Sequence, residues 1–277
     1  MRGAGARGPP DEISRLAGIE PASPPGRCNR ALRPRPRATG RGADRHPPVR
    51  PALSIVVPVL DEAATLADRL RALETFRRHG ARVVVVDGGS RDDTMAIALD
   101  HADLVFHAPR GRASQMNAGA AACPADVLLF LHADTVLPDD ADVLVARALA
   151  GRRAWGRFDV RIDSPRRLLR VVAAMMNLRS RWSGIATGDQ ALFVRHELFE
   201  RVGGFPELPL MEDVAISRRL KRHGRPACLR ARVTTSARRW ERHGVWRTIL
   251  LMWRLRAAYF FGADPRALAI RYGYRPR

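Results

Sequence analysis

Acidic residues follow three apolar runs in the first half of this 277-residue chain. In chain order the clusters are Asp61-Glu62 after residues 53–58, Asp87 after residues 82–86, and His132-Ala-Asp134 after residues 127–131. Carboxylates are costly to bury without partners, so their recurrence after buried segments indicates a use. A carboxylate can accept a hydrogen bond from a base N–H or a ribose hydroxyl. Each cluster taken singly is also typical of a helix N-cap, but the three together favour a nucleotide site.

The His132-Ala-Asp134 cluster has the chemistry of a cation site. A carboxylate oxygen is a good ligand for a hard divalent cation, whose other ligands can be diphosphate oxygens and water. His132 is a poorer ligand for Mg²⁺ but an acceptable one for Mn²⁺. We therefore predict bound Mg²⁺ or Mn²⁺, with Asp134 and His132 as ligands. A helix cap is the alternative for Asp134.

The segment 87–94 combines two glycines with polar residues. Glycines at this point let the backbone turn close to a ligand. Ser90 or Asp92 can cap the helix that follows. No G-x-G-x-x-G pattern follows the first apolar run, which argues against a nicotinamide or flavin enzyme.

The elements that must position these residues alternate along the chain. Continuous apolar runs predict buried strands, and amphipathic patterns between them predict helices, so the first half should be a parallel sheet covered on both faces. Ligands of such a sheet lie outside the carboxyl ends of its strands, where the acidic clusters fall. The predicted strands are 53–58, 82–86, 104–106 and 127–131, and the predicted helices are 63–79, 94–99 and 112–122.

The pattern is looser in the second half. There we expect strands at 154–162 and 190–194 and helices at 166–176, 213–223 and 245–261. The predicted fold class is therefore α/β, with a Rossmann-like, mostly parallel sheet flanked by helices. We expect a disordered tail at 1–50, one catalytic domain at 51–244, and a C-terminal amphipathic helix and tail at 245–277.

Composition limits the other function classes. The net charge is +20, but Lys221 is the only lysine among 48 basic residues, which looks like codon bias rather than a selected nucleic-acid surface. Residues 1–50 hold nine of the 20 prolines and little apolar periodicity, which is typical of disorder. The three cysteines lack disulfide or metal spacing. No signal peptide or membrane span is evident, so we expect a cytoplasmic protein.

Three segments in order resemble the successive motifs of family 2 glycosyltransferases, which are inverting enzymes with the GT-A fold. The segments are Val56-Val-Pro58-Val-Leu-Asp61-Glu62, Val86-Asp87-Gly-Gly-Ser90-Arg-Asp92-Asp93-Thr94 and Phe130-Leu-His132-Ala-Asp134. The resemblance covers roughly residues 52–245. It departs from the usual D-x-D motif at His132, where most members carry Asp.

The resemblance implies a nucleotide-diphosphate sugar donor, linked to UDP or GDP, and assigns roles by position. Asp87 would contact the base, Glu62 would line the same pocket, and Asp134 would bind the metal. The same pocket would include Pro58, Ser90 and Asp92, with Arg112 as a candidate for the diphosphate.

Inverting transfer needs a base that takes the proton of the acceptor hydroxyl. The segment Met211-Glu212-Asp213 resembles the family's E-D motif, which implies that Asp213 is the base and that Glu212 orients acceptor or sugar. Without the family, two acids opening a helix are an ordinary helix-dipole arrangement. Donor or acceptor contacts are expected from Gly188, Asp189, Gln190, Arg239 and Trp240.

The segment 245–261 mixes aromatic and aliphatic residues with arginines. Such a helix can lie among lipid headgroups, or it can pack on its own domain. If it contacts the membrane, the protein is peripheral on the inner face and the acceptor is a lipid such as an isoprenoid or carotenoid-like compound.

Two other functions stay open. A nucleotidyltransferase usually carries a glycine-rich basic loop after its first strand, where this chain has Pro58-Val-Leu-Asp61-Glu62. A non-catalytic module that binds nucleic acid or membrane would explain the basic charge but not the acidic clusters.

Overall fold

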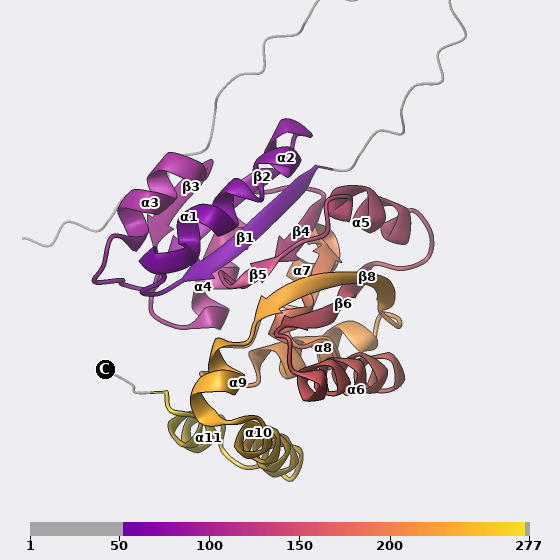
Figure 1. Cartoon of the computed structure of the whole chain (residues 1–277). Coiled ribbons are helices and arrows are strands. Elements are labelled where there is room, and N and C mark those ends of the chain that lie inside the picture. Colours follow the sequence, from indigo (N-terminus) through magenta and orange to yellow (C-terminus); the bar gives the residue numbers. More distant parts are fainter. Residues whose placement is uncertain (1–51, 275–277) are drawn as a thin grey trace, which may run out of the picture. The chain divides into compact units, whose positions relative to one another are not determined.

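One mixed sheet of eight strands organises residues 52–274, the part of the chain that this computed structural model describes. The strand order is β3-β2-β1-β4-β7-β6-β8-β5 (Figure 1). The predicted tail at 1–50 lies outside the described residues.

The first half is the predicted parallel unit. It contains β1 (Leu53–Val59), β2 (Arg82–Asp87), β3 (Leu104–His107) and β4 (Val127–Phe130), and its neighbouring strands pair in parallel. The helices between them are α1 (Ala63–Arg71), α2 (Glu74–Arg78), α3 (Thr94–His101) and α4 (Arg112–Ala122). The helix expected at 63–79 is thus two helices, separated by a turn at Ala72 and Leu73.

Both faces of this half are buried because side chains alternate along each strand. Ile55 and Val57 share one hydrophobic cluster with Leu66 of α1. Val56 points to the other face and packs with Met116 of α4. The continuous apolar runs of the sequence follow from this two-sided burial.

The second half adds antiparallel pairs, so the sheet as a whole is mixed. β7 (Phe193–Arg195) pairs antiparallel with both β4 and β6 (Trp155–Asp163). β8 (Ala227–Ser236) runs parallel to β6, and the short β5 (Thr135–Val136) closes that edge. The strand expected at 190–194 begins only at Phe193, because residues 188–190 form a 3₁₀ turn.

β8 has no counterpart among the predicted strands. It carries Arg230 and Arg232 and is largely half-exposed, so it shows neither the continuous apolar run nor the clean alternation by which strands are recognised. It is nevertheless the strand that leads into the predicted contact residues Arg239 and Trp240.

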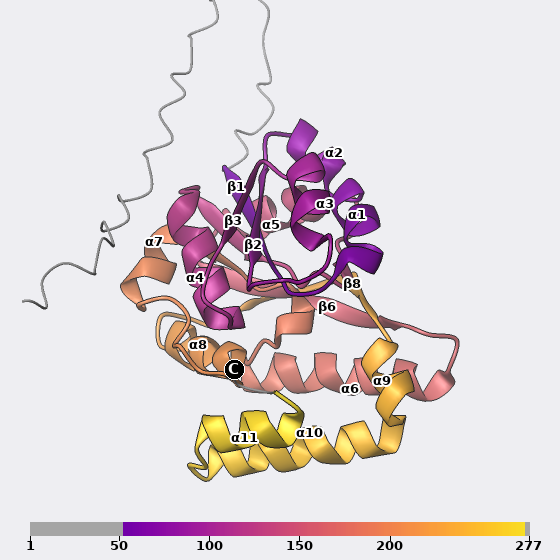
Figure 2. The same cartoon turned by 90° about the vertical axis from the view of Figure 1, so that its left-hand side faces the viewer.

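Helices of the second half cover the sheet and extend beyond it. They are α5 (Ala141–Leu149), α6 (Arg167–Ser183), α7 (His196–Arg201), α8 (Glu212–Lys221), α9 (Arg238–His243), α10 (Val245–Phe260) and α11 (Pro265–Tyr272). α6 is longer than expected and ends at Gly184, whose φ of 64° gives a left-handed C-cap. α10 and α11 pack on each other and lie beneath α6 in Figure 2.

Within the described residues, no helix has the combination of length and apolar character that crossing a bilayer requires. The two cysteines of this part of the chain, Cys123 and Cys228, are free thiols.

Gly156 provides a test of the packing among the strands of the second half. It lies on β6 opposite Phe193 of β7 and Ala227 of β8. An added Cβ would lie 2.4 Å from the Ala227 carbonyl oxygen and 2.5 Å from Phe193 Cζ. Because the backbone there is held in the sheet, we expect Gly156→Ala to lower the free energy of unfolding by about 1–3 kcal/mol in chemical denaturation.

Gly151→Ala is the matched control. A Cβ at Gly151 meets nothing within 4 Å, so we expect a change within about 0.5 kcal/mol. Equal effects of the two substitutions would contradict the close approach at β6.

Candidate functional site

The loops after β1 and β2 are joined to each other by hydrogen bonds. The donor and acceptor atoms are Asp61 N to Ser90 Oγ (2.9 Å), Arg91 N to Asp61 Oδ1 (2.8 Å), Glu62 N to Thr94 Oγ1 (2.9 Å) and Ala63 N to Asp92 Oδ2 (3.1 Å). Ser90 and Asp92 therefore hold the two loops together at the carboxyl edge of the sheet. Asp92 also accepts from Thr94 N at 3.1 Å, although the N-cap residue of α3 is Asp93.

Asp87 is fully buried at the end of β2, and its carboxylate is well supplied with donors. Oδ2 accepts from Gly89 N at 2.8 Å and Ser90 N at 2.9 Å, and it pairs with His107 Nδ1 at 2.9 Å. Burial acts to raise the pKa of Asp87, but the hydrogen bonds from Ser90 and Gly89 and the nearby His107 outweigh it and lower that pKa below 3.8. The ionised carboxylate therefore holds the glycine turn that follows β2.

Gln115 of α4 also stabilises the carboxyl edge of the sheet. Its buried Nε2 donates to Val59 O at 2.8 Å and to Val86 O at 2.7 Å, at the ends of β1 and β2. These contacts hold the ends of the two strands together where the loops leave the sheet. Nothing in the local sequence distinguishes Gln115 from an ordinary helix residue.

Arg238, at the start of α9, connects the second half to these loops. Its Nη2 donates to Glu62 Oε2 at 2.9 Å. The bond to Glu62, and then the negative charge of Asp134, raise the pKa of the Arg238 guanidinium. Glu62 and Arg238 are thus paired, and Ser236 N donates to Asp134 O at 3.2 Å beside them in the chain, although sequence reasoning singled out only the two acids.

Asp134 lies between β4 and β5 and is half-buried. Its Oδ1 accepts from Thr135 Oγ1 at 3.3 Å. No group of three or more His, Cys, Asp or Glu side chains within residues 52–274 is arranged to hold a metal ion by itself. The donor set fits a cation only if a diphosphate and water supply the other ligands, as was expected for Asp134.

His132 is turned toward the segment at 188–189. Its Nδ1 lies 3.4 Å from Asp189 Oδ1, and an added Cβ at Gly188 would lie 2.3 Å from His132 Nε2. Desolvation acts to raise the pKa of Asp189, but the bond with His132 and the charge of Arg112 keep that pKa below its usual value. Only a glycine at 188 leaves room for the imidazole in this position.

Glu212 and Asp213 open α8 on the other side of Gly188. Asp213 Oδ2 accepts from Gly188 N at 3.0 Å, and Oδ1 accepts from Val214 N at 2.7 Å. Burial, and then the charge of Asp213, raise the pKa of Glu212. Adjacent carboxylates in unequal surroundings are suited to different protonation states. Asp213 is half-buried whereas Glu212 is only 5% exposed, so Asp213 is the more accessible of the two carboxylates.

Arg112, at the start of α4, lies among these acids. Desolvation acts to lower the pKa of its guanidinium, but Glu212, Tyr272, Asp189 and Asp213 together raise it. Its side chain still reaches solvent. An exposed guanidinium surrounded by carboxylates can bind an anion only if that anion competes with them or if a cation accompanies it.

Gln190 makes hydrogen bonds that stabilise the fold. Its buried Oε1 accepts from Thr187 N at 3.2 Å, and its Nε2 donates to Asn177 Oδ1 at 3.3 Å. These bonds shape the turn that presents Gly188 and Asp189. A contact between Gln190 and a sugar stays a prediction.

The C-terminal helix α11 contacts a predicted site residue. The Arg239 guanidinium carbon lies 3.9 Å from the centroid of the Tyr272 ring, a cation–π contact. Burial raises the pKa of Tyr272, which also lies near Arg112. Trp240 is half-buried against the main hydrophobic cluster. Sequence reasoning missed Tyr272, since nothing in a short terminal helix indicates a return to the site.

A narrow cavity of about 10 Å³ lies where α4 and the end of β4 meet the Gly188 turn and the start of α8. His132, Gly188, Glu212 and Asp213 line it together with Phe130, Phe205 and other apolar residues. Asp87 and Asp134 are not part of this lining. The volume corresponds to about one water molecule, so a sugar ring can enter only if lining side chains move.

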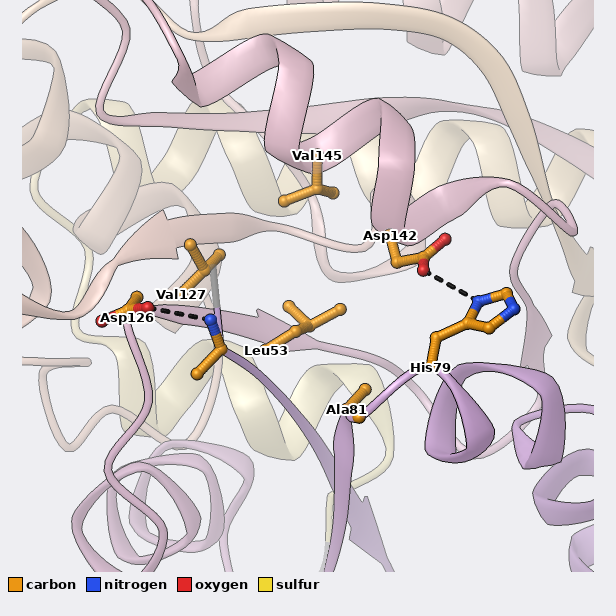
Figure 3. Close-up of a pocket in the computed structure, with 9 residues that line it drawn as sticks. Leu53, His79, Ala81, Asp126, Val127, Asp142 and Val145 are labelled. Carbon is orange, nitrogen blue, oxygen red and sulfur yellow. Dashed lines mark hydrogen bonds and ion pairs between the residues drawn. The ribbon is translucent and has the colours of Figure 1, made fainter. Parts of the chain in front are cut away.

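A cavity of about 360 Å³ lies at the opposite edge of the sheet (Figure 3). Leu53, Ala81 and Val127 place it at the amino ends of β1, β2 and β4. There His79 Nδ1 pairs with Asp142 Oδ2 at 3.0 Å, and Asp126 Oδ2 accepts from Ala52 N at 2.8 Å. Because ligands of parallel sheets lie at the carboxyl ends, the size of this cavity does not make it the functional site.

Comparison with known sequences matches more than half of the chain to one family. The sequence model described as Glycosyl transferase family 2 matches residues 54–205. An undecaprenyl-phosphate 4-deoxy-4-formamido-L-arabinose transferase of Pseudomonas fluorescens is 32% identical over 157 residues, 52% of this chain and 46% of that protein. A PGL/p-HBAD biosynthesis glycosyltransferase of Mycobacterium bovis is 28% identical over 172 residues, 56% of this chain and 63% of that protein. The chain thus spans about half to two thirds of the length of these relatives.

Solved structures agree on the fold. The S. aureus TarS 1-349 structure in complex with UDP-GlcNAc has a TM-score of 0.57 at 19% identity and covers 67% of this chain and 58% of that one. The mannosyltransferase PcManGT from Pyrobaculum calidifontis, in complex with GDP-Man and Mn²⁺, has a TM-score of 0.55 at 21% identity and covers 82% of this chain and 66% of that one. Likeness at this identity shows the fold alone, and it confirms the predicted GT-A architecture.

The buried Asp87 predicts a pH dependence of stability. Because its folded pKa is lowered, the ionised group stabilises the fold above its ordinary pKa of 3.8, and this contribution is lost as pH falls further. We expect Asp87→Asn to lower the free energy of unfolding at pH 7 by about 1–3 kcal/mol. The variant should also lose less stability than the wild type when denaturation is repeated at lower pH.

Asp139→Asn, on the exposed turn before α5, is the control and should keep the wild-type pH profile. An Asp87→Asn profile parallel to that of the wild type at every pH would contradict the account of Asp87.

Proposed function

The chain belongs to the family 2 glycosyl transferases, and we propose that it moves a sugar from a nucleotide-diphosphate donor to an acceptor hydroxyl or carboxyl with inversion at the anomeric carbon. The observation that carries this proposal is the row of joined acidic segments along the carboxyl edge of the sheet. Arg238 donates to Glu62, and Ser236 N, two residues earlier in the chain, donates to Asp134 O. Gly188 lies against His132 and donates to Asp213. Donor and acceptor would meet along this row.

The donor nucleotide would lie on the loops after β1 and β2. Pro58, Glu62, Asp87, Ser90 and Asp92 are the proposed pocket, with Arg112 directed at the diphosphate. For a base N–H to bond Asp87, it must share the carboxylate with the donors that already occupy it, among them His107. Complexes of fold relatives with UDP-GlcNAc and GDP-Man support a UDP- or GDP-linked sugar.

Asp213 is the proposed base. It would accept the proton of the acceptor hydroxyl as that oxygen bonds to the anomeric carbon, while the bond from that carbon to the diphosphate oxygen breaks and the nucleoside diphosphate leaves. The N–H of Gly188 orients the Asp213 carboxylate. Burial favours the neutral form of Glu212, which would then donate a hydrogen bond to acceptor or sugar. Asp189 is proposed to bond sugar hydroxyls, and Arg239 and Trp240 to contact diphosphate and sugar.

Asp134 is the proposed protein ligand of a divalent cation, Mg²⁺ or Mn²⁺, that would neutralise charge on the leaving diphosphate. The complex of PcManGT with GDP-Man and Mn²⁺ supports a metal in this fold. His132 remains the candidate second ligand. Its Nδ1 faces Asp189, and its ring packs against Gly188.

The proposed acceptor is a lipid. The relatives named as undecaprenyl-phosphate transferases support this class, although the chain spans only 46% of their length. A nucleotide-sugar donor and a lipid acceptor would meet at the inner face of the cell membrane, which is the proposed location.

Asp213→Asn tests the base assignment. The amide keeps the shape and can still face Gly188 N, but it cannot take a proton, so we expect turnover with the best nucleotide sugar to fall by about 10²–10⁴-fold. The affinity for the nucleoside diphosphate, measured by isothermal titration calorimetry, should change little. Glu197→Gln, on the exposed face of α7, is the control. Full activity of Asp213→Asn would show that the base lies elsewhere.

Asp134→Asn tests the metal ligand. We expect Mn²⁺ to increase the affinity of the wild type for a nucleoside diphosphate. In the variant, the factor by which Mn²⁺ increases this affinity should be at least about tenfold smaller. His132→Asn, measured in parallel, shows whether the imidazole contributes to the same gain. If Asp134→Asn retains the whole effect of Mn²⁺, Asp134 is not the ligand.

A further inference from the structure

Exposed large apolar side chains gather on one region of the molecule. In the described residues, every one of them except Leu99 belongs to α6, α10, α11 or the residue after α10. We call the first group the α6 stripe: Val171, Met175, Leu178 and Trp182. We call the second group the α10 stripe: Trp246, Leu250, Trp253, Phe260 and Phe261.

Each stripe has helical periodicity. Steps of three or four residues place Val171, Met175, Leu178 and Trp182 on one side of α6. Trp246, Leu250 and Trp253 have the same spacing on α10, and Phe260 follows about two turns later at the end of the helix. α10 already buries another side through Val245, Thr248 and Leu255. A helix that only covers its own domain presents polar residues outward. The exposed apolar side chains of the α10 stripe therefore indicate that this side of the helix contacts a partner.

Three of the five tryptophans of the chain lie in these stripes. Trp182, Trp246 and Trp253 are 78%, 68% and 66% exposed, whereas Trp155 is fully buried. Tryptophan suits an environment that is apolar at one end and polar at the other, as at the surface of a bilayer.

The charged residues within the helices of this region are all basic. α6, α10 and α11 carry four, three and two arginines and no acidic residue. Arg167 and Arg170 of α6 and Arg247 and Arg254 of α10 are exposed. Long arginine side chains can lie along apolar surface while their guanidinium groups reach anionic phosphates.

We propose that the α6 and α10 stripes dock on the surface of a membrane that contains anionic lipids. α10 would lie in the headgroup region with its tryptophans toward the acyl chains and its arginines at the phosphates. A second copy of the chain fits this surface poorly. A two-fold contact would place the surface against itself, and its arginines would meet no acidic partners on these helices.

The docking surface is joined to the candidate site through α10. Leu255, on the buried side of this helix, packs with Met211 and Val214, which flank the Glu212-Asp213 pair. Arg256 lies close enough for its charge to help lower the pKa of Asp189. Docking would therefore hold the site beside the bilayer, and the presentation of a lipid acceptor, which rests on the proposed function, would follow from it.

Vesicle co-sedimentation of the full chain tests the proposal. We expect binding to vesicles of phosphatidylcholine with phosphatidylglycerol and at least tenfold weaker binding to phosphatidylcholine alone. Trp246→Ser with Trp253→Ser should weaken binding to the anionic vesicles at least tenfold. Arg247→Gln with Arg254→Gln should lower the preference for anionic over neutral vesicles several-fold. Leu99→Ser, at the one exposed large apolar residue of the described chain that lies outside α6 and the α10–α11 segment, is the matched control and should bind as the wild type does.

The midpoint of thermal unfolding of each variant should match that of the wild type. A loss of vesicle binding then cannot be attributed to a loss of folding. Vesicle binding that survives both tryptophan substitutions would overturn the proposal, because the basic segment 1–50 could then account for it. A dimer in sedimentation velocity that the tryptophan substitutions dissociate, without vesicle binding, would overturn it in favour of a second copy. Nucleoside diphosphate binding without vesicles reports on the proposed function alone, so either proposal can fail while the other stands.

Discussion

Carboxylates collected at one edge of a sheet must each find a donor, and this constraint explains much of how the loops of the protein are connected. Asp87 is satisfied by its own turn and by His107, Asp213 by the N–H of Gly188, and Glu62 by Arg238. The contacts with His107, Gly188 and Arg238 each join two segments that lie apart in the sequence. The segments that could do chemistry are therefore the same segments that hold the edge together.

The second half of the sheet brings its groups to this edge by a less regular route. β7 runs antiparallel between β4 and β6, and the turn before it presents Gly188 and Asp189. Three non-glycine residues of the described chain have positive φ: Asp61, Ala191 and Met211. They lie beside Glu62, after the Gly188 turn and before Glu212. Unusual backbone conformations often accompany functional sites, and here they flank three of the segments assigned a role.

The sequence predicted the first half well because its strands are buried on both faces. Runs such as 82–86 have few alternatives to a central strand, and the acidic residues after them could only lie at the carboxyl edge. β8 was missed because a half-exposed strand with arginines shows no such pattern. Arg238 and Tyr272 were missed for another reason: their contacts with Glu62 and Arg239 join residues far apart in the sequence, and no local signal reports them.

The proposed function requires that a nucleoside diphosphate binds along the joined loops at the carboxyl edge. Hydrogen–deuterium exchange of the full chain, with and without UDP or GDP and Mn²⁺, tests it most directly. We predict concerted protection of the loops around Glu62, Ser90 and Asp134 and of the β8–α9 junction at Arg238. Protection confined to the opposite edge, around His79 and Asp126, or no protection by either nucleotide, would contradict it.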